Sequence, residues 1–156
     1  MNVLQNSSVV ILAVCFSPVA DKDWKAVTKD IKIEANLQLK QLQIKTDYVA
    51  GSNKQLSLYF YDNQGPWLAG GLKIVFFSQI KYWISFCEDR YIPFPTTPTK
   101  DQDKVWSFLR TKTGLEVECN GVLVLEYNTS LCIKDHDKWG REIKQIEFTS
   151  DSASGH

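Results

Sequence analysis

An Asn-Gly pair at positions 120 and 121 separates two runs of alternating apolar and polar residues. Both residues of a two-residue hairpin turn need positive φ, which asparagine and glycine tolerate best. The pair is therefore a strong short-range signal for a β-hairpin. It predicts strands at Leu115–Cys119 and Val122–Tyr127, with a third strand before them at Lys104–Thr111. We expect the chain to be organised around these three antiparallel strands.

Alternation with period two continues through most of the chain and favours strands. A change of parity near Lys40 indicates a bulge or a break within Ile31–Thr46, where a helix is the alternative interpretation. Pro93 belongs to the long connection Glu88–Asp103, whose prolines exclude a central strand. About nine or ten strands at short spacing predict an all-β fold, an antiparallel two-sheet β-sandwich. The other expected strands are Trp24–Asp30, Gln55–Asp62, Leu72–Phe77, Lys81–Cys87 and Arg141–Thr149, with Trp67–Gly71 as a glycine-rich loop.

The order W-x3-R, L-x-V-x-C-N-G and V-x-V resembles the middle of laminin-G-like and concanavalin A-like sandwiches, which implies a jelly roll. Because such sandwiches serve as lectins, hydrolases and adhesion modules, the resemblance implies no single function. The motifs YWISFC, DKVW and CNG also resemble uncharacterised secreted proteins of cnidarians and other marine invertebrates, which implies secretion but no chemistry. The residues that match the sandwich pattern are Trp106, Arg110, Leu115, Val117, Asn120, Gly121 and Val124.

The first charged residue is Asp21, and the apolar run Val9–Phe16 precedes it. This pattern predicts a signal peptide at residues 1–20, a single sandwich domain at 21–149 and a disordered polar tail at 150–156. A buried N-terminal strand is the alternative for the apolar run. The 18 basic and 18 acidic residues balance, which argues against nucleic acid as a partner, and no segment is long enough to span a membrane. We therefore expect a secreted protein.

Three cysteines follow the predicted leader: Cys87, Cys119 and Cys132. An odd number in an oxidising compartment allows one disulfide and one leftover thiol. If consecutive strands alternate in direction, Cys87 and Cys119 lie at the same end of the sheet, which favours a Cys87–Cys119 bond. The path of the Glu88–Asp103 connection could reverse this pairing, and three reduced buried thiols are the other alternative.

Two groups of residues are candidates for chemistry. Glu116 and Glu118 project from one strand face, and a retaining glycosidase needs two carboxyl groups about 5 Å apart. The third acid of the usual E-x-D-x-x-E run is missing, so a solvated strand face is the simpler interpretation.

His136, between Asp135 and Asp137, lies four residues after Cys132, but a structural zinc site needs four ligands. Calcium at Asp135 and Asp137 lacks the remaining oxygen ligands. We expect no enzyme activity, no metal and no cofactor.

The sequence Asn128-Thr129-Ser130 is an N-glycosylation acceptor in an expected loop. Asn128 is therefore predicted to carry a glycan if the protein is secreted.

Aromatic residues beside amides and acids suggest a sugar site, because flat rings cover C–H faces while polar groups bind hydroxyls. The alternative is that these rings are ordinary core or half-buried strand residues. We expect a non-catalytic protein that binds glycan or another extracellular ligand. A structural protein of the extracellular matrix, with Cys132 available for contacts, is the alternative, and a glycoside hydrolase is third. The predicted ligand-binding residues are Tyr59, Tyr61, Asp62, Asn63, Trp67 and Tyr91.

Overall fold

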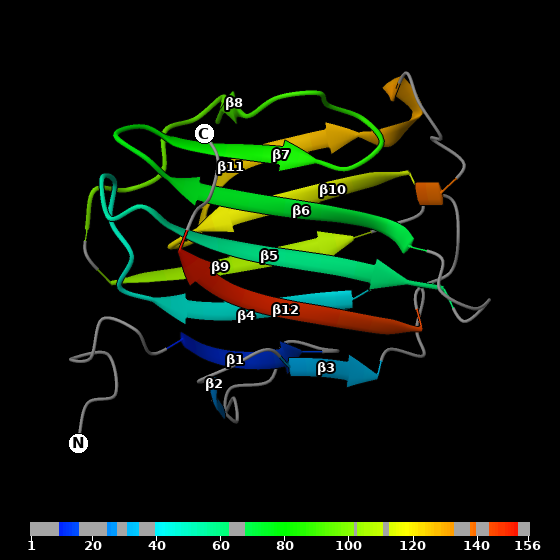
Figure 1. The fold of residues 1–156 in the computed structure, drawn as a ribbon, viewed down its shortest axis with the longest axis horizontal. Coiled ribbons are helices and arrows are strands. Elements are labelled where there is room, and N and C mark those ends of the chain that lie inside the picture. The colour runs from blue at the N-terminus through cyan, green and yellow to red at the C-terminus, as the bar shows by residue number, and fades with distance from the viewer. Residues whose placement is uncertain are drawn as a thin grey trace.

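The protein is a sandwich of two six-stranded antiparallel sheets in the computed structural model (Figure 1). The structure describes residues 10–15, 25–27, 31–34, 40–62, 68–101, 103–110, 113–132, 138–139 and 144–152. Sheet A contains, in spatial order, β11 (Val122–Asn128), β10 (Gly114–Cys119), β9 (Lys104–Arg110), β4 (Lys40–Thr46), β1 (Val10–Cys15) and β2 (Lys25–Val27). Sheet B contains β3 (Ile31–Glu34), β12 (Gln145–Ser152), β5 (Lys54–Tyr61), β6 (Leu68–Phe76), β7 (Ile80–Ile84) and β8 (Ile92–Pro93). The predicted sandwich is confirmed, with more strands than the nine or ten expected.

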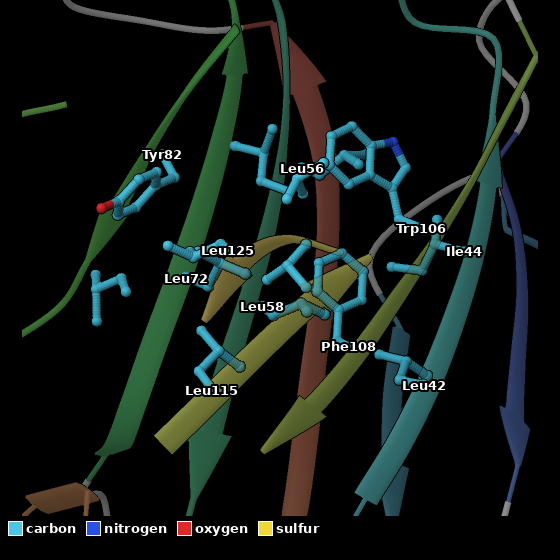
Figure 2. Close-up of a cluster of buried hydrophobic side chains, with 14 of the residues drawn as sticks. Leu42, Ile44, Leu56, Leu58, Leu72, Tyr82, Trp106, Phe108, Leu115 and Leu125 are labelled. Atoms are coloured by element: carbon cyan, nitrogen blue, oxygen red, sulfur yellow. The ribbon is translucent and has the colours of Figure 1, made fainter. Parts of the chain in front are cut away.

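The core lies between the sheets and follows directly from the alternation in the sequence. Strand β9 alternates buried and half-buried residues along its whole length, and β10 does the same. Figure 2 shows side chains from both sheets meeting in this layer, with the Trp106 ring among them. Trp106 is fully buried and packs edge-on against Phe76 of sheet B, with ring centroids 6.0 Å apart. Trp106 therefore lies on the inward face of β9.

The predicted hairpin turn is confirmed at Asn120 and Gly121, whose φ angles are 50° and 80°. The Asn120 side chain also ties the turn to the neighbouring strand. Its Oδ1 accepts a hydrogen bond of 2.7 Å from the Val105 N–H, and its Nδ2 donates to the Asp103 carbonyl at 3.2 Å. A single turn residue therefore fixes both the hairpin and the beginning of β9.

Two cations lie on the inward face of β9, one at each end of the strand. Each is only 1% exposed, and burying a charge is costly unless hydrogen bonds compensate. Lys104 donates to the Tyr48 carbonyl at 2.9 Å and to the Asp101 carbonyl. Arg110 donates to the carbonyls of Ala69 at 2.7 Å and Trp139 at 2.9 Å, and burial lowers the pKa of Arg110 to about 10. The two cations thus attach the ends of β9 to the segment after β4, to β6 and to the segment that contains Trp139.

The apolar run at the N-terminus contributes a strand to sheet A. Strand β1 pairs with β4 from Ile11↔Lys45 to Cys15↔Gln41, and with β2 on its other side. This placement agrees with the alternative of an N-terminal strand. Cleavage after Ala20 concerns processing and stays a prediction. If it occurs, β4 loses the neighbour on one side and keeps β9 on the other.

The other boundaries differ from expectation at several points. The break expected near Lys40 is larger than a bulge, because β3 belongs to sheet B and β4 to sheet A. The expected loop Trp67–Gly71 is wrong for Leu68–Gly71, which belongs to β6. The predicted tail begins too early, since Ser150–Ser152 pairs with β5 as the end of β12. Tertiary pairing decides these boundaries, and local composition does not reveal it.

The predicted Cys87–Cys119 disulfide is wrong, because Cys87 is bonded to Cys132 and Cys119 is a buried free thiol. The error arises from β8, a two-residue strand inside the proline-rich connection that pairs antiparallel with β7. Because of this extra strand, each strand after β8 runs opposite to the direction that simple alternation after β7 predicts. Strands β7 and β11 therefore end on the same side of the sandwich, whereas β10 ends on the opposite side (Figure 1). Cys87 and Cys132, which follow β7 and β11, can thus bond, and Cys119 at the end of β10 cannot.

The part of the chain that the structure describes contains no helix with the length and hydropathy needed to cross a membrane.

Candidate ligand-binding site on the outer face of sheet B

A hollow of about 570 Å³ lies on the outer face of sheet B, beside the edge formed by β7 and β8. We call it the Trp83 pocket. Outward residues of β6 and β7 form its floor, because inward positions of the same strands belong to the core. The segment after β7 forms its wall. The pocket is lined by Lys73, Phe77, Lys81, Trp83, Asp89, Arg90 and Tyr91.

Trp83 is held in place from two sides. Its indole Nε1 donates a hydrogen bond of 3.0 Å to the Glu88 carbonyl. Lys73 is its cross-strand partner, and the Lys73 ammonium lies 5.4 Å from the centre of the Trp83 ring, a cation–π distance. The ring is half-buried, so one part contacts the sheet and the rest faces the hollow. A ring fixed in this way offers a preformed surface for stacking.

The segment that carries the wall is anchored at Glu88. The Cys87–Cys132 disulfide directly precedes it. The Glu88 carboxylate accepts a hydrogen bond of 2.7 Å from the Tyr127 hydroxyl, and burial together with Glu88 raises the pKa of Tyr127. Glu88 therefore joins β11, the disulfide and Trp83, which fixes the position of the residues that follow.

A second aromatic pair closes one side of the pocket. Tyr91 packs edge-on against Phe77, with ring centroids 6.0 Å apart and an angle of 88° between the planes. Both rings are half-buried. Three aromatic rings thus surround the hollow, and Tyr91 is the member that the sequence predicted.

Charge in the pocket is mostly positive. Lys73, Lys81 and Arg90 line it with Asp89 as the acid among the lining residues. Arg90 is exposed and Lys81 is half-buried, so both charges can reach a ligand in the pocket. Guanidinium and ammonium groups bind carboxylates and sulfate esters through charge-assisted hydrogen bonds.

The other predicted ligand-binding residues lie elsewhere. Tyr59 and Tyr61 are half-buried on the same outer face of sheet B but do not line the Trp83 pocket. Tyr59 lies against Gly71, where a Cβ atom would come within 3.0 Å of the ring, and the Tyr61 hydroxyl donates to Glu147 at 3.2 Å. Asp62 is 4% exposed. Asn63 and Trp67 fall outside the described residues, so their role stays a prediction.

The candidates for chemistry are on sheet A or outside the described residues. Glu116 and Glu118 are half-buried on β10, and the cross-strand partner of Glu116 is Glu126 on β11. Asp135, His136 and Asp137 lie outside the described residues. In the remainder, which the structure describes, no three His, Cys, Asp or Glu side chains gather in a way suited to a metal ion.

The predicted glycosylation site is exposed at the end of β11. Asn128 caps the short 3-10 helix η2 (Thr129–Leu131), and its Oδ1 accepts hydrogen bonds from the Ser130 N–H and hydroxyl at 3.0 and 2.7 Å. The residue is therefore accessible, while its occupancy stays a prediction.

The sequence did not predict Trp83 or the cations Lys73, Lys81 and Arg90 as site residues. A signal for Trp83 exists, because strict alternation through KYWI turns either Tyr82 or Trp83 outward. The cations carry no comparable signal. Lys73 and Lys81 are eight residues apart, and they line one pocket only because β6 and β7 pair in this register.

Comparisons with known proteins give no family for this chain. No family model matches it, and no curated protein matches it. Among solved structures it is similar to sheep galectin-11 in complex with glycerol, at 12% identity over 81% of this chain and 93% of that chain, with a TM-score of 0.46. A structure from work on endo-acting O-glycanases of the human gut microbiota has 9% identity over 94% of this chain and 66% of that chain, with a TM-score of 0.45. An alginate lyase in complex with dimannuronate has a TM-score of 0.28 at 9% identity, over 95% and 91% of the two chains.

Proposed function

We propose that the protein is a non-catalytic carbohydrate-binding sandwich that takes an acidic glycan in the Trp83 pocket. The observation that carries the proposal is the fixed Trp83 ring on a floor that also presents Lys73 and Lys81. The ring would cover a C–H face of a sugar, and the cations would bind its carboxylate or sulfate groups.

A secreted location fits this function. The Cys87–Cys132 disulfide supports an oxidising compartment, where such bonds form and persist. The same bond weakens the alternative of a matrix protein linked through Cys132, because the sulfur of Cys132 is already used.

Calorimetric titration with a heparin-derived hexasaccharide and with neutral maltohexaose tests the proposal. We expect the acidic sugar to bind and the neutral sugar to bind much more weakly. Affinity for the acidic sugar should fall as salt rises, since exposed charges are screened over about 8–10 Å at physiological ionic strength.

Matched variants locate the site. Trp83→Ala should weaken binding about fivefold, the equivalent of about 1 kcal/mol for one stacked ring. Lys81→Ala should also weaken it, whereas Lys54→Ala is the control, because Lys54 also lies on a strand of sheet B but does not line the pocket. Tyr59→Ala measures whether the patch predicted from sequence contributes. Equal affinity for both sugars, or unchanged binding in Trp83→Ala, contradicts the proposal.

A further inference from the structure

A second cavity, which shares no residue with the Trp83 pocket, lies between the sheets at one end of the sandwich. Its volume is about 350 Å³, within the range of small-molecule sites. Residues 49–50 after β4, the turn between β6 and β7, and Phe94 with residues 97–100 before β9 surround it. These loops gather at the left end of the molecule in Figure 1. We call it the Lys104 cavity.

The walls of the Lys104 cavity are largely apolar. Ile80, Phe94 and Pro98 are buried core residues that contribute to it, and Val49 is a half-buried neighbour. Phe94 is fixed against the Trp106 ring, with centroids 5.9 Å apart. A wall of this kind favours an aliphatic or aromatic body over a hydrated ligand.

The charged residues that line the Lys104 cavity are all positive. Lys100 and Lys104 are among the lining residues, which include no acid. Lys104 is 1% exposed, whereas Lys100 is exposed at the surface. The acids near Lys104 in sequence, Asp101 and Asp103, are exposed to solvent and do not line the cavity.

Two backbone carbonyls hold the Lys104 ammonium in place. It has three N–H groups, and the carbonyls of Tyr48 and Asp101 accept two of them. The carboxylates of Asp47, Asp101 and Asp103 also act on the ammonium electrostatically, and none of the three lines the cavity. Burial lowers the pKa of Lys104 and these carboxylates oppose that shift, so a further anion beside the ammonium would offset more of the cost of desolvation.

We propose that the Lys104 cavity binds a small organic anion, a monocarboxylate with an apolar body, whose carboxylate accepts the third Lys104 N–H. The apolar part would lie against Ile80, Phe94 and Pro98. The site is independent of glycan binding, since the two hollows have no lining residue in common. Its occupant would hold together the three loops that close this end of the sandwich.

The test uses hexanoate and the nearly isosteric neutral hexanamide, followed by amide chemical shifts of the folded protein. We expect hexanoate to shift resonances of residues 78–80 and 97–100 in a saturable manner. Hexanamide should bind about tenfold more weakly or worse, because it forms no charge-assisted hydrogen bond with Lys104.

Two neighbouring threonines provide matched variants. Thr97 and Thr96 are both exposed in the same loop, and Thr97 lines the cavity while Thr96 does not. Thr97→Trp should abolish hexanoate binding, and Thr96→Trp should leave it unchanged. Lys104→Met keeps an apolar stem and removes the charge, so in a folded variant hexanoate should lose its advantage over hexanamide.

Three results overturn the proposal: hexanoate produces no saturable shifts, hexanoate and hexanamide bind equally, or Thr97→Trp binds hexanoate as the wild type does. If Lys104→Met does not fold, two measurements still test the proposal. These are the comparison of hexanoate with hexanamide on the wild type and the binding of hexanoate to the two threonine variants. Trp83→Ala should not affect hexanoate binding, so failure of either proposal can be recognised separately.

Discussion

The Trp83 indole donates a hydrogen bond of 3.0 Å to the carbonyl of Glu88, the residue directly after the disulfide-bonded Cys87. This bond joins the floor of the Trp83 pocket to the segment that forms its wall. The covalent link to Cys132 holds that segment near the end of β11, where Tyr127 binds the Glu88 carboxylate. The disulfide therefore supports the pocket as well as the fold.

Removal of the disulfide should destabilise the protein and weaken glycan binding. The Cys87–Cys132 bond closes a loop with a sequence separation of 45, so its loss in Cys132→Ser should cost on the order of 4 kcal/mol by the chain-entropy estimate. Chemical denaturation measures this cost. Cys119→Ala is the control, because Cys119 is the free thiol and its truncation leaves the bond intact.

A reducing agent should affect the thermal stability of the two variants differently. It should lower the melting temperature of the wild type and of Cys119→Ala, and should leave Cys132→Ser unchanged. Sensitivity to reduction in Cys132→Ser would mean that Cys87 pairs with Cys119 after all.

The local pattern was sufficient for the hairpin at Asn120-Gly121 and for the inward face of β9, because each depends on alternation and turn chemistry within a few residues. The disulfide was not predictable in the same way. Its partner depends on the direction of β11, and β8 reverses that direction with only two residues, one of them Pro93. A strand this short, at a sheet edge and containing proline, gives almost no periodic signal.

The candidate site was predicted only in part, for a related reason. Tyr91 was identified from composition in a loop, since an aromatic beside polar residues is visible locally. Lys73 and Trp83 become neighbours through the cross-strand register of β6 and β7, which local sequence patterns do not predict. Gly70 shows the same limit: a glycine-rich loop was expected, whereas the residue lies within β6 under the Trp139 ring.

Gly70→Ala should be strongly destabilising. Gly70 has φ of 102°, and a Cβ atom there would lie 2.5 Å from the Trp139 ring. Trp139 cannot move easily, because its Nε1 donates to the Ser85 carbonyl at 2.9 Å and its carbonyl accepts from Arg110. Backbone strain and overpacking together should cost roughly 2–4 kcal/mol.

Gly51→Ala is the matched control for this prediction. Gly51 has φ of 88°, but nothing lies within 4 Å of an added Cβ atom. It should cost only the backbone strain, about 1–2 kcal/mol. Equal losses of unfolding free energy in the two variants would show that the contact with Trp139 contributes nothing.

Trp106→Ala should cost about 3–5 kcal/mol, because it removes a fully buried ring and leaves a cavity among Phe76, Phe94 and Phe108. Trp106→Phe should cost clearly less. The Trp106 Nε1 is buried without a hydrogen-bond partner, so its removal relieves part of the loss. Denaturant unfolding measures both, and a loss below about 1 kcal/mol for the alanine variant would contradict the central position of this ring.

Processing of the N-terminus is tested by sequencing the protein from the medium of a eukaryotic secretory host. We expect the mature chain to begin at Asp21, as the charge-free apolar leader predicts. The mature chain would then lack β1, and β4 would become an edge strand of sheet A. If the secreted protein retains Val10–Cys15, the predicted cleavage after Ala20 is wrong. These residues then remain paired with β4 in the mature protein.

Asp47→Asn should increase stability near neutral pH. Asp47 is 5% exposed, and its Oδ1 is buried without a hydrogen-bond partner. Burial raises the pKa of Asp47 above its ordinary value of 3.8, and the nearby Lys104 charge opposes this shift only in part. The folded protein therefore holds a proton at Asp47 more tightly than the unfolded chain, so this carboxyl destabilises the fold as pH rises through that window.

Thermal unfolding of Asp47→Asn and wild type at several pH values checks the sign. The variant should melt at a higher temperature near neutral pH, where the carboxylate of Asp47 is charged in the unfolded wild-type chain. Below about pH 3 the two proteins should converge, because Asp47 is then protonated in both states and its charge no longer matters. Asp101→Asn, at an exposed position, should change the unfolding free energy by no more than about 0.5 kcal/mol. A variant that is less stable than wild type at neutral pH would mean that the Asp47 charge is favourably paired in solution.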